Sequence, residues 1–194
     1  MTLLQVMPDD APQRTLLRTR DHQLIAAELA AHGVLFERWP VRGAIDADTG
    51  DDAVLARYAT EGAQLRARAG LRLVDVATLL PEENPAWRER VAQSRGTFLD
   101  EHRHAEDEVR FFAHGSGCFY LRLGGRVYAV LCEAGDLLSV PAATRHWFDM
   151  GPHPEFVAIR FFAQEDGWVG DFTGETIARR FPLLDDLLAA EPTG

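Results

Sequence analysis

The chain has few cysteines, no long apolar run and no excess of positive charge, and each shortage excludes a class of protein. Cys118 and Cys132 lie in apolar, strand-like runs without the spacing of metal ligands, so we expect buried free thiols in a reducing compartment. No apolar run approaches the roughly 18 residues that span a bilayer. Residues 1–8 are too short and too uncharged for a signal peptide. We therefore expect a cytoplasmic protein with no membrane partner.

The balance of charge and the length of the chain narrow the choice further. Lys and Arg total 20 against 30 for Asp and Glu, which gives a net charge of −10. This charge argues against nucleic acid or an anionic membrane as a partner, because both bind basic surfaces. The 194 residues suit one domain, and we see no repeat or linker that would divide them. We expect a monomer that acts on a small molecule.

Residues 1–95 carry mainly helical signals. Asp can cap a helix through its side-chain oxygen, glycine commonly ends one, and proline is favoured at the first helical position. The predicted elements are helices from Asp21 to Gly33, from Asp51 to Gly70 and from Asn84-Pro85 towards Ser94, with strands at 34–40 and 71–76.

From residue 96 the pattern changes to short β runs at close spacing. Gly124-Gly125 is a two-residue hairpin signal, and we interpret 114–117 as a second hairpin turn. Thr173 is a candidate cap for a terminal helix that ends at Arg180. The predicted strands are 108–112, 117–123, 126–132, 136–140, 145–150 and 155–162.

Short strands between glycine and proline turns are typical of an antiparallel barrel or jelly roll. The sequence therefore predicts a mainly β fold with flanking helices, as a single domain over 1–194. In this division 1–95 pack on the barrel, 96–165 form its metal-binding core, and 166–194 are a tail with a helix.

The stretch 96–115 carries the chemistry around which the chain is organised. His102 and His104 are two residues apart, so a strand places both imidazoles on one face, whereas a helix would point them apart. A straight strand would carry Glu108 roughly 13 Å beyond His104. We predict that 105–107 bend the chain and return Glu108 to the pair. The alternative is a pair of exposed strand histidines beside a solvated glutamate.

A fourth ligand is expected later in the chain, and His146 follows a predicted strand and a turn that contains Pro141. Three imidazoles and one carboxylate suit a first-row divalent ion, whereas a structural zinc site more often contains cysteine. Four protein ligands on an ion that accepts six leave two positions for water or a chelating substrate.

These stretches resemble the cupin superfamily. The first has Gly, five residues, His-x-His, three residues, Glu, six residues and Gly; the second has Gly, five residues, Pro and then His, with Ala143 and Met150 where Gly and Asn are usual. More specifically, 102–112, 141–151, 158–162 and 167–171 resemble the acireductone dioxygenase family, and the likeness covers roughly 96–182.

The resemblance implies a cupin-type jelly-roll barrel that holds one Fe(II) or Ni(II) per chain through His102, His104, Glu108 and His146. It implies that acireductone, an enediol-ketone of methionine salvage, chelates the metal as a dianion and reacts with O2. With iron the family forms formate and 4-methylthio-2-oxobutanoate. With nickel it forms methylthiopropanoate, formate and carbon monoxide.

Two arginines are candidate catalytic residues. Arg110 lies two residues after Glu108 on the same strand face, and Arg160 lies in an apolar strand where an unpaired charge would be costly. We predict that one or both stabilise the substrate oxyanions. The alternatives are a salt bridge from Arg110 to Glu108 or Asp107, and a structural pair between Arg160 and a buried carboxylate.

Further residues are predicted around the site. Phe98, Phe148 and Trp168 form a candidate apolar wall for the methylthio tail, although each could instead be core. Asp107 and Asp149 are candidates to orient histidine N–H groups.

Two other functions share the same ligands, and one turn departs from the usual cupin pattern. The chain could be another cupin enzyme, an isomerase or a quercetinase-like dioxygenase, or a non-enzymatic small-molecule-binding cupin. The last predicts lost ligands or an attached DNA-binding domain, and the sequence has neither. Ala143 replaces a glycine that can take positive φ, so we expect either roughly 1 kcal/mol of strain in the turn before His146 or a turn of another shape.

Overall fold

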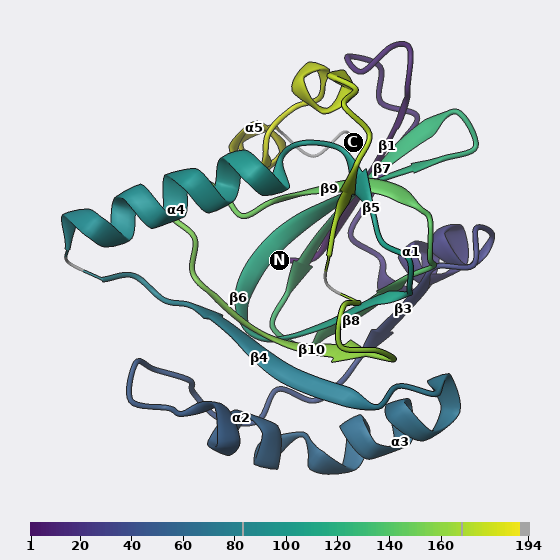
Figure 1. The fold of residues 1–194 in the computed structure, drawn as a ribbon. Helices are drawn as coiled ribbons and strands as arrows, with labels where there is room; N and C mark the ends of the chain where they lie inside the picture. The colour runs from purple at the N-terminus through teal and green to yellow at the C-terminus, as the bar shows by residue number, and fades with distance from the viewer. Residues whose placement is uncertain (83, 168, 191–194) are drawn as a thin grey trace.

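Two antiparallel sheets share one long strand in the computed structural model, which describes residues 1–82, 84–167 and 169–190 (Figure 1). The shared strand is β6 (Glu108–Leu123). Its first half pairs with β8 (Asp136–Val140) and β10 (Phe156–Phe162). Its second half pairs with β7 (Arg126–Glu133) and β9 (Arg145–Asp149). The strand thus links the two layers that enclose the core.

The other strands extend these sheets, and every pairing is antiparallel. β4 (Leu73–Leu79) joins β10, and β3 (Leu35–Arg38) joins β8. On the other sheet β7 pairs with β1, β1 with β2, β9 with β5, and β5 with β11. These four are β1 (Leu3–Pro8), β2 (Leu17–Thr19), β5 (His102–Arg103) and β11 (Asp171–Phe172). Among the described residues the pairings do not close into a ring. The mainly β architecture with flanking helices agrees with the prediction.

The helices begin largely where the capping residues predict. The side chain of Asp21 accepts hydrogen bonds from the backbone N–H groups of Gln23 and Leu24, and Asn84 accepts one from Trp87. The helices are α1 (His22–Ala30), α2 (Asp51–Arg57), α3 (Ala59–Ala69), α4 (Pro85–Phe98) and α5 (Leu184–Ala189), with a 3₁₀ turn at Ile177–Arg180. Over the described part of the chain, none is long and apolar enough to cross a membrane.

The outer face of each sheet is also covered. Helices α2 and α3 lie outside one sheet, beside β4 (Figure 1). Tyr58 and Leu65 of this region pack with Phe111 and Phe161. Outside the other sheet, the C-terminal segment packs against Tyr120 and Trp147 through Ile177, Phe181, Leu184 and Leu187. Strands buried on both faces read as continuous apolar runs rather than alternating ones. This explains why the sequence predicts the positions of these strands but does not show which side of each strand faces the core.

The interpretation of 114–117 as a hairpin turn is wrong, because these residues continue β6. Gly115 has φ +68°, and a Cβ on it would overlap the carbonyl group of Glu155. The register on the paired strand shifts between Val157 and Ala158. A bulge bends a strand and increases its twist. Gly115 therefore marks the place where β6 leaves one sheet and enters the other.

Three further expectations differ from the structure. The helix predicted from Asp51 to Gly70 is divided at Tyr58, whose φ of −115° is not helical. Thr173 does not cap a helix; its hydroxyl donates to the Glu101 carboxylate at 2.8 Å. The sequence reading also missed β1 and β2, since fully buried β1 shows no alternation. In contrast, Gly124-Gly125 does form the predicted hairpin, both residues having positive φ.

Candidate metal centre

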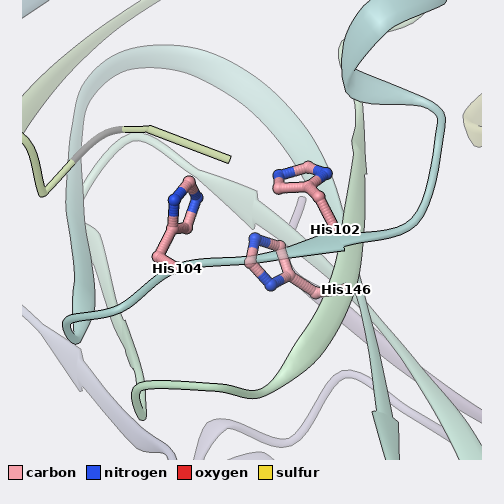
Figure 2. Close-up of side chains that lie close together, drawn as sticks. All are labelled: His102, His104 and His146. Atoms are coloured by element: carbon pink, nitrogen blue, oxygen red, sulfur yellow. The ribbon is translucent and has the colours of Figure 1, made fainter. Parts of the chain in front are cut away.

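Three buried histidines from two separate parts of the chain meet at one point (Figure 2). His102 of β5 lies directly opposite His146 of β9 in the strand register, with ring centroids 4.4 Å apart. His104 follows β5, and its ring lies 5.2 Å from each of the other two. One nitrogen from each ring falls within 4.8 Å of the others. This separation allows the three nitrogens to bind one ion.

Each of these rings is oriented by a backbone carbonyl. Nδ1 of His102 lies 2.8 Å from the carbonyl oxygen of Asp100, and Nδ1 of His146 lies 2.9 Å from that of Thr144. Nδ1 of His104 lies 2.9 Å from the carbonyl of Val169. A carbonyl only accepts, so each Nδ1 carries the proton and donates it. The lone pair then resides on Nε2, which is the arrangement that a metal ligand requires.

Glu108 returns to the histidines as the first residue of β6, after a bend at 105–106. Its Oε2 lies 3.5 Å from Nε2 of His104 and 2.8 Å from Nε2 of His146. Although the second distance is short, neither Oε2 nor the His146 Nε2 has a hydrogen bond of acceptable geometry. Buried polar atoms are rarely left without a partner. Two such atoms beside two further imidazoles fit a divalent cation.

Burial and mutual charge set the ionisation of this cluster. Burial lowers the pKa of His102 to about 4 and also lowers that of His104, so both rings are neutral at pH 7. Burial acts in the same direction on His146, but the carboxylate of Glu108 reverses it and the pKa is raised. Burial alone would raise the pKa of Glu108, yet Arg110 and His146 together hold it well below its usual range. The carboxylate therefore stays charged.

Both candidate catalytic arginines are engaged by carboxylates. Nη2 of Arg110 lies 2.8 Å from Oε1 of Glu108, as in the alternative proposed from the sequence. Nε and Nη2 of Arg160 contact the two carboxylate oxygens of Asp75 at 2.8 and 2.6 Å, although Asp75 is about half exposed rather than buried. The two guanidinium groups also lie over the same Phe162 ring, at 5.3 and 5.5 Å. Each arginine thus has a structural partner and still borders the site.

A cavity of about 140 Å³ opens from the histidines into the space between the sheets. Its polar end contains the three histidines, Glu108, Arg110 and Arg160, and its apolar end includes Phe112, Phe119, Phe148, Met150 and Phe156. Phe98 also borders this cavity from the end of α4, with 44% of its surface exposed. Phe148 belongs to the inter-sheet cluster and borders the cavity too. Trp168, the third member of the predicted wall, lies outside the described residues.

The prediction that Asp107 and Asp149 orient histidines is wrong. Asp107 accepts a hydrogen bond from the backbone N–H of Ala142. Asp149 is fully buried and binds Arg95 through two hydrogen bonds of 2.8 and 3.2 Å. The backbone carbonyls take the place that these carboxylates were expected to fill. Asp149 instead holds α4 against β9.

Two residues near the site were missed by the sequence reading. Asp75 is a charged residue within the apolar run 73–79, a signal that could have identified it. Glu106 accepts hydrogen bonds from the backbone N–H groups of Ala163 and Gln164 at 2.9 and 3.2 Å. It thereby anchors the segment that leads to the Val169 carbonyl. Only the folded chain reveals this contact.

Ala143, in the turn before His146, has positive φ, so of the two alternatives left open by the sequence the turn keeps the shape that favours glycine. Its φ is +60°, while its backbone N–H donates to the carbonyl of His104 at 2.9 Å. A left-handed conformation is strained for a residue with a Cβ. The turn therefore keeps a glycine-like shape without glycine.

The chain is similar to known proteins over nearly its whole length. The family model described as "ARD/ARD′ family" matches residues 4–170. "Acireductone dioxygenase 2" of Nocardia farcinica is 58% identical over 98% of this chain and 100% of that protein. "Acireductone dioxygenase" of Pseudomonas aeruginosa is 50% identical over 96% of this chain and 100% of its own length. A solved acireductone dioxygenase from Bacillus anthracis, with a cadmium ion in its active centre, is 28% identical with a TM-score of 0.75. That comparison covers 89% of this chain and 98% of the solved one.

Proposed function

Because the chain belongs to the ARD/ARD′ family, that of the acireductone dioxygenases, we propose that it is a metal-dependent dioxygenase that oxidises acireductone with O2 in methionine salvage. The observation that carries this proposal is the buried cluster of three imidazoles and one ionised carboxylate beside a cavity with a polar and an apolar end. The proposal includes the products. With iron these are 4-methylthio-2-oxobutanoate and formate, and with nickel they are methylthiopropanoate, formate and carbon monoxide.

His102, His104, Glu108 and His146 would hold one Fe(II) or Ni(II) ion. Imidazole nitrogens and a carboxylate suit both metals, and the three Nε2 lone pairs are already directed by their Nδ1 hydrogen bonds. When bound, the ion supplies a Lewis acid on which an enediolate can be held for its reaction with O2.

The charges of the site match a dianionic substrate. Glu108 carries one negative charge and Arg110 one positive charge, and the Asp75–Arg160 pair adds no net charge. Histidines that bind a metal are neutral donors, so a bound divalent ion would leave the centre with a net charge of two positive units. Buried charge is tolerated when it is compensated locally. A dianionic enediolate compensates it, whereas a neutral sugar would not.

Arg110 and Arg160 would orient that substrate. Both guanidinium groups border the polar end of the cavity, and Asp75 engages Nε and Nη2 of Arg160 but not Nη1. A fixed cation beside the developing charge stabilises it without reorganisation. The apolar end of the cavity and Phe98 exclude bulk water from the activated substrate.

The test is O2 uptake by the iron(II)-loaded protein after addition of anaerobically generated acireductone. We expect rapid uptake with formate and the keto acid as products, and carbon monoxide from the nickel-loaded protein. His104→Ala should abolish both, whereas exposed His153→Ala should not. Uptake no faster than autoxidation, with metal demonstrably bound, would contradict the substrate assignment. Another cupin chemistry on a different enol would then be the next candidate.

We further propose that the protein is a cytoplasmic monomer. Size-exclusion chromatography with light scattering should give a mass near that of one 21.6 kDa chain. A mass of two chains or more would contradict the monomer.

A further inference from the structure

Three residue pairs cross from β4 to β10 on the face that lines the cavity. In the register Asp75 lies opposite Arg160, Ala77 opposite Ala158, and Leu79 opposite Phe156. Alternate residues share a face of a strand, and successive pairs on that face are roughly 7 Å apart. The row therefore runs from a charged pair at the metal end, through a pair of alanines, to an apolar pair further inside.

The apolar end of the cavity is a box of four phenylalanine rings. Phe119 lies 6.4 Å from the ring of His146 and 4.7 Å from that of Phe148. Phe156 lies 6.0 Å from Phe148 and 6.2 Å from Phe112, which completes the circuit with Phe119 at 6.5 Å. The box thus begins beside the metal centre and extends into the space between the sheets.

Gly117 allows the Phe148 ring to take its place in this box. A Cβ on Gly117 would overlap the end of the Phe148 ring. The absence of a side chain at 117 is therefore a condition for the box to form around the cavity.

Among the three described pairs of this β4–β10 row, the alanine pair is the one in which both facing side chains are small. Ala77 and Ala158 border the same cavity as the four rings, and Ala158 is buried within the inter-sheet cluster. Larger residues occupy the pairs on either side of them in the row. The free space of the cavity at this level depends on two methyl groups.

We propose that Ala77 and Ala158 determine the length and bulk of the apolar tail that the substrate carries. The proposal rests on the proposed function, since an enediol head bound at the metal centre directs the remainder of the molecule into the phenylalanine box. An unbranched tail passes between the alanine pair and the rings. A longer or branched tail meets Leu79 and Phe156.

The test compares enediol-ketones with the same head and with hydrogen, ethyl, propyl, methylthioethyl or hexyl as the tail. For the wild-type protein we expect kcat/KM to rise roughly fourfold for each buried methylene and then fall with the hexyl tail. Ala158→Leu should lower kcat/KM at least about tenfold for the methylthioethyl tail, and less than about threefold for the hydrogen tail. Ala77→Val, a β-branched residue suited to a strand, should show the same pattern in weaker form.

Thr78→Val is the matched control, because residue 78 is the next position on β4 and is exposed. It should leave kcat/KM unchanged for every tail in the series. Metal content and thermal midpoint are measured for each variant. If Ala158→Leu does not fold, Ala77→Val and the wild-type series still decide the question.

Three outcomes would overturn the proposal. The first is a wild-type kcat/KM that does not depend on the tail. The second is a loss of kcat/KM that is equal for every tail in both variants. The third is no loss of kcat/KM in either variant. Failure of the proposed function has a different signature. In that case no tail gives O2 uptake above autoxidation, while anaerobic titration of the iron-loaded protein shows whether affinity still depends on tail length and on residues 77 and 158.

Discussion

The histidine side and the carboxylate side of the candidate metal centre are held by different kinds of partner. Backbone carbonyls of Asp100, Thr144 and Val169 orient the three imidazoles. Charged side chains hold the other side, where Arg110 binds Glu108 and Asp75 binds Arg160. A carbonyl fixes the direction of a ring without adding a charge, and no substitution removes it. Side-chain replacement should therefore damage the carboxylate side directly and the histidine side only through the segments that carry the carbonyls.

Arg110→Gln should have the largest effect, because it leaves the buried carboxylate of Glu108 without its cation. We expect kcat/KM to fall about 100-fold. The metal-free protein should lose about 3 kcal/mol of unfolding free energy, the cost of breaking a buried pair. Bound metal should restore part of this loss, since it also neutralises the carboxylate. Urea unfolding with and without metal measures the difference.

Arg126→Gln is the control for this experiment, because residue 126 is exposed at the start of β7. It should change neither stability nor activity. An equal loss of stability in the metal-free and metal-loaded Arg110→Gln protein would show that Glu108 is not neutralised by the ion.

Glu106→Gln tests whether the histidine side can be disturbed through a segment. The neutral amide holds the N–H groups of Ala163 and Gln164 more weakly, which loosens the carbonyl of Val169 that orients His104. We expect metal affinity to fall roughly tenfold, as for other partners of metal ligands. Competition with a metal-binding dye measures it. Glu165→Gln, an exposed change in the same segment, should have no effect; a matching loss there would refute the anchoring role.

Asp75→Asn tests the outer pair on the carboxylate side. Arg160 should stay in place through its contact with Phe162 but lose its fixed orientation, because the carboxylate no longer binds Nε and Nη2 together. We expect kcat/KM to fall about fivefold with unchanged metal affinity, because Asp75 is half exposed and the pair is partly screened. Steady-state kinetics measure kcat/KM, and metal titration measures the affinity for the ion. The exposed pair Glu82–Arg90 provides the control Glu82→Gln, and a loss of metal affinity in Asp75→Asn would contradict this account.

Ala143→Gly should have the smallest effect, and it should be stabilising. Glycine removes the strain at φ +60° but adds freedom to the unfolded chain, so the net gain should be about 0.5 kcal/mol. Ala142→Gly, at the neighbouring position without positive φ, should instead destabilise. Thermal unfolding of the two variants side by side decides the sign. Destabilisation by both would show that the turn is not strained.

The sequence predicted those parts of the fold and site that depend on neighbours in the chain. The helix start at Asn84-Pro85 and the Gly124-Gly125 hairpin are local signals, and both are present. The joining of His102, His104 and Glu108 by a bend follows from strand geometry alone. These elements could be predicted because few residues set their conformation.

Elements that depend on distant contacts were misjudged. Tyr58 divides a predicted helix where its ring packs 4.6 Å from that of Phe111 and its hydroxyl accepts the N–H of Arg42. Gly115 was read as part of a turn, because its place within β6 depends on pairing with the distant residue Phe156 of β10. Asp149 was expected beside a histidine, and its actual partner, Arg95, lies on a helix 54 residues away in sequence.

By itself, the sequence identified the imidazole and carboxylate groups of the candidate metal centre, because these groups belong to particular residues and their strand spacing is local. It also identified the two arginines that border the centre. Only the tertiary structure decided how these groups are held. Every residue has a backbone carbonyl, so the sequence does not distinguish the carbonyl of Val169 from any other. This carbonyl accepts a hydrogen bond from His104, which is 65 residues away in sequence. The small pair of Ala77 and Ala158 likewise becomes a feature only when β4 and β10 lie side by side.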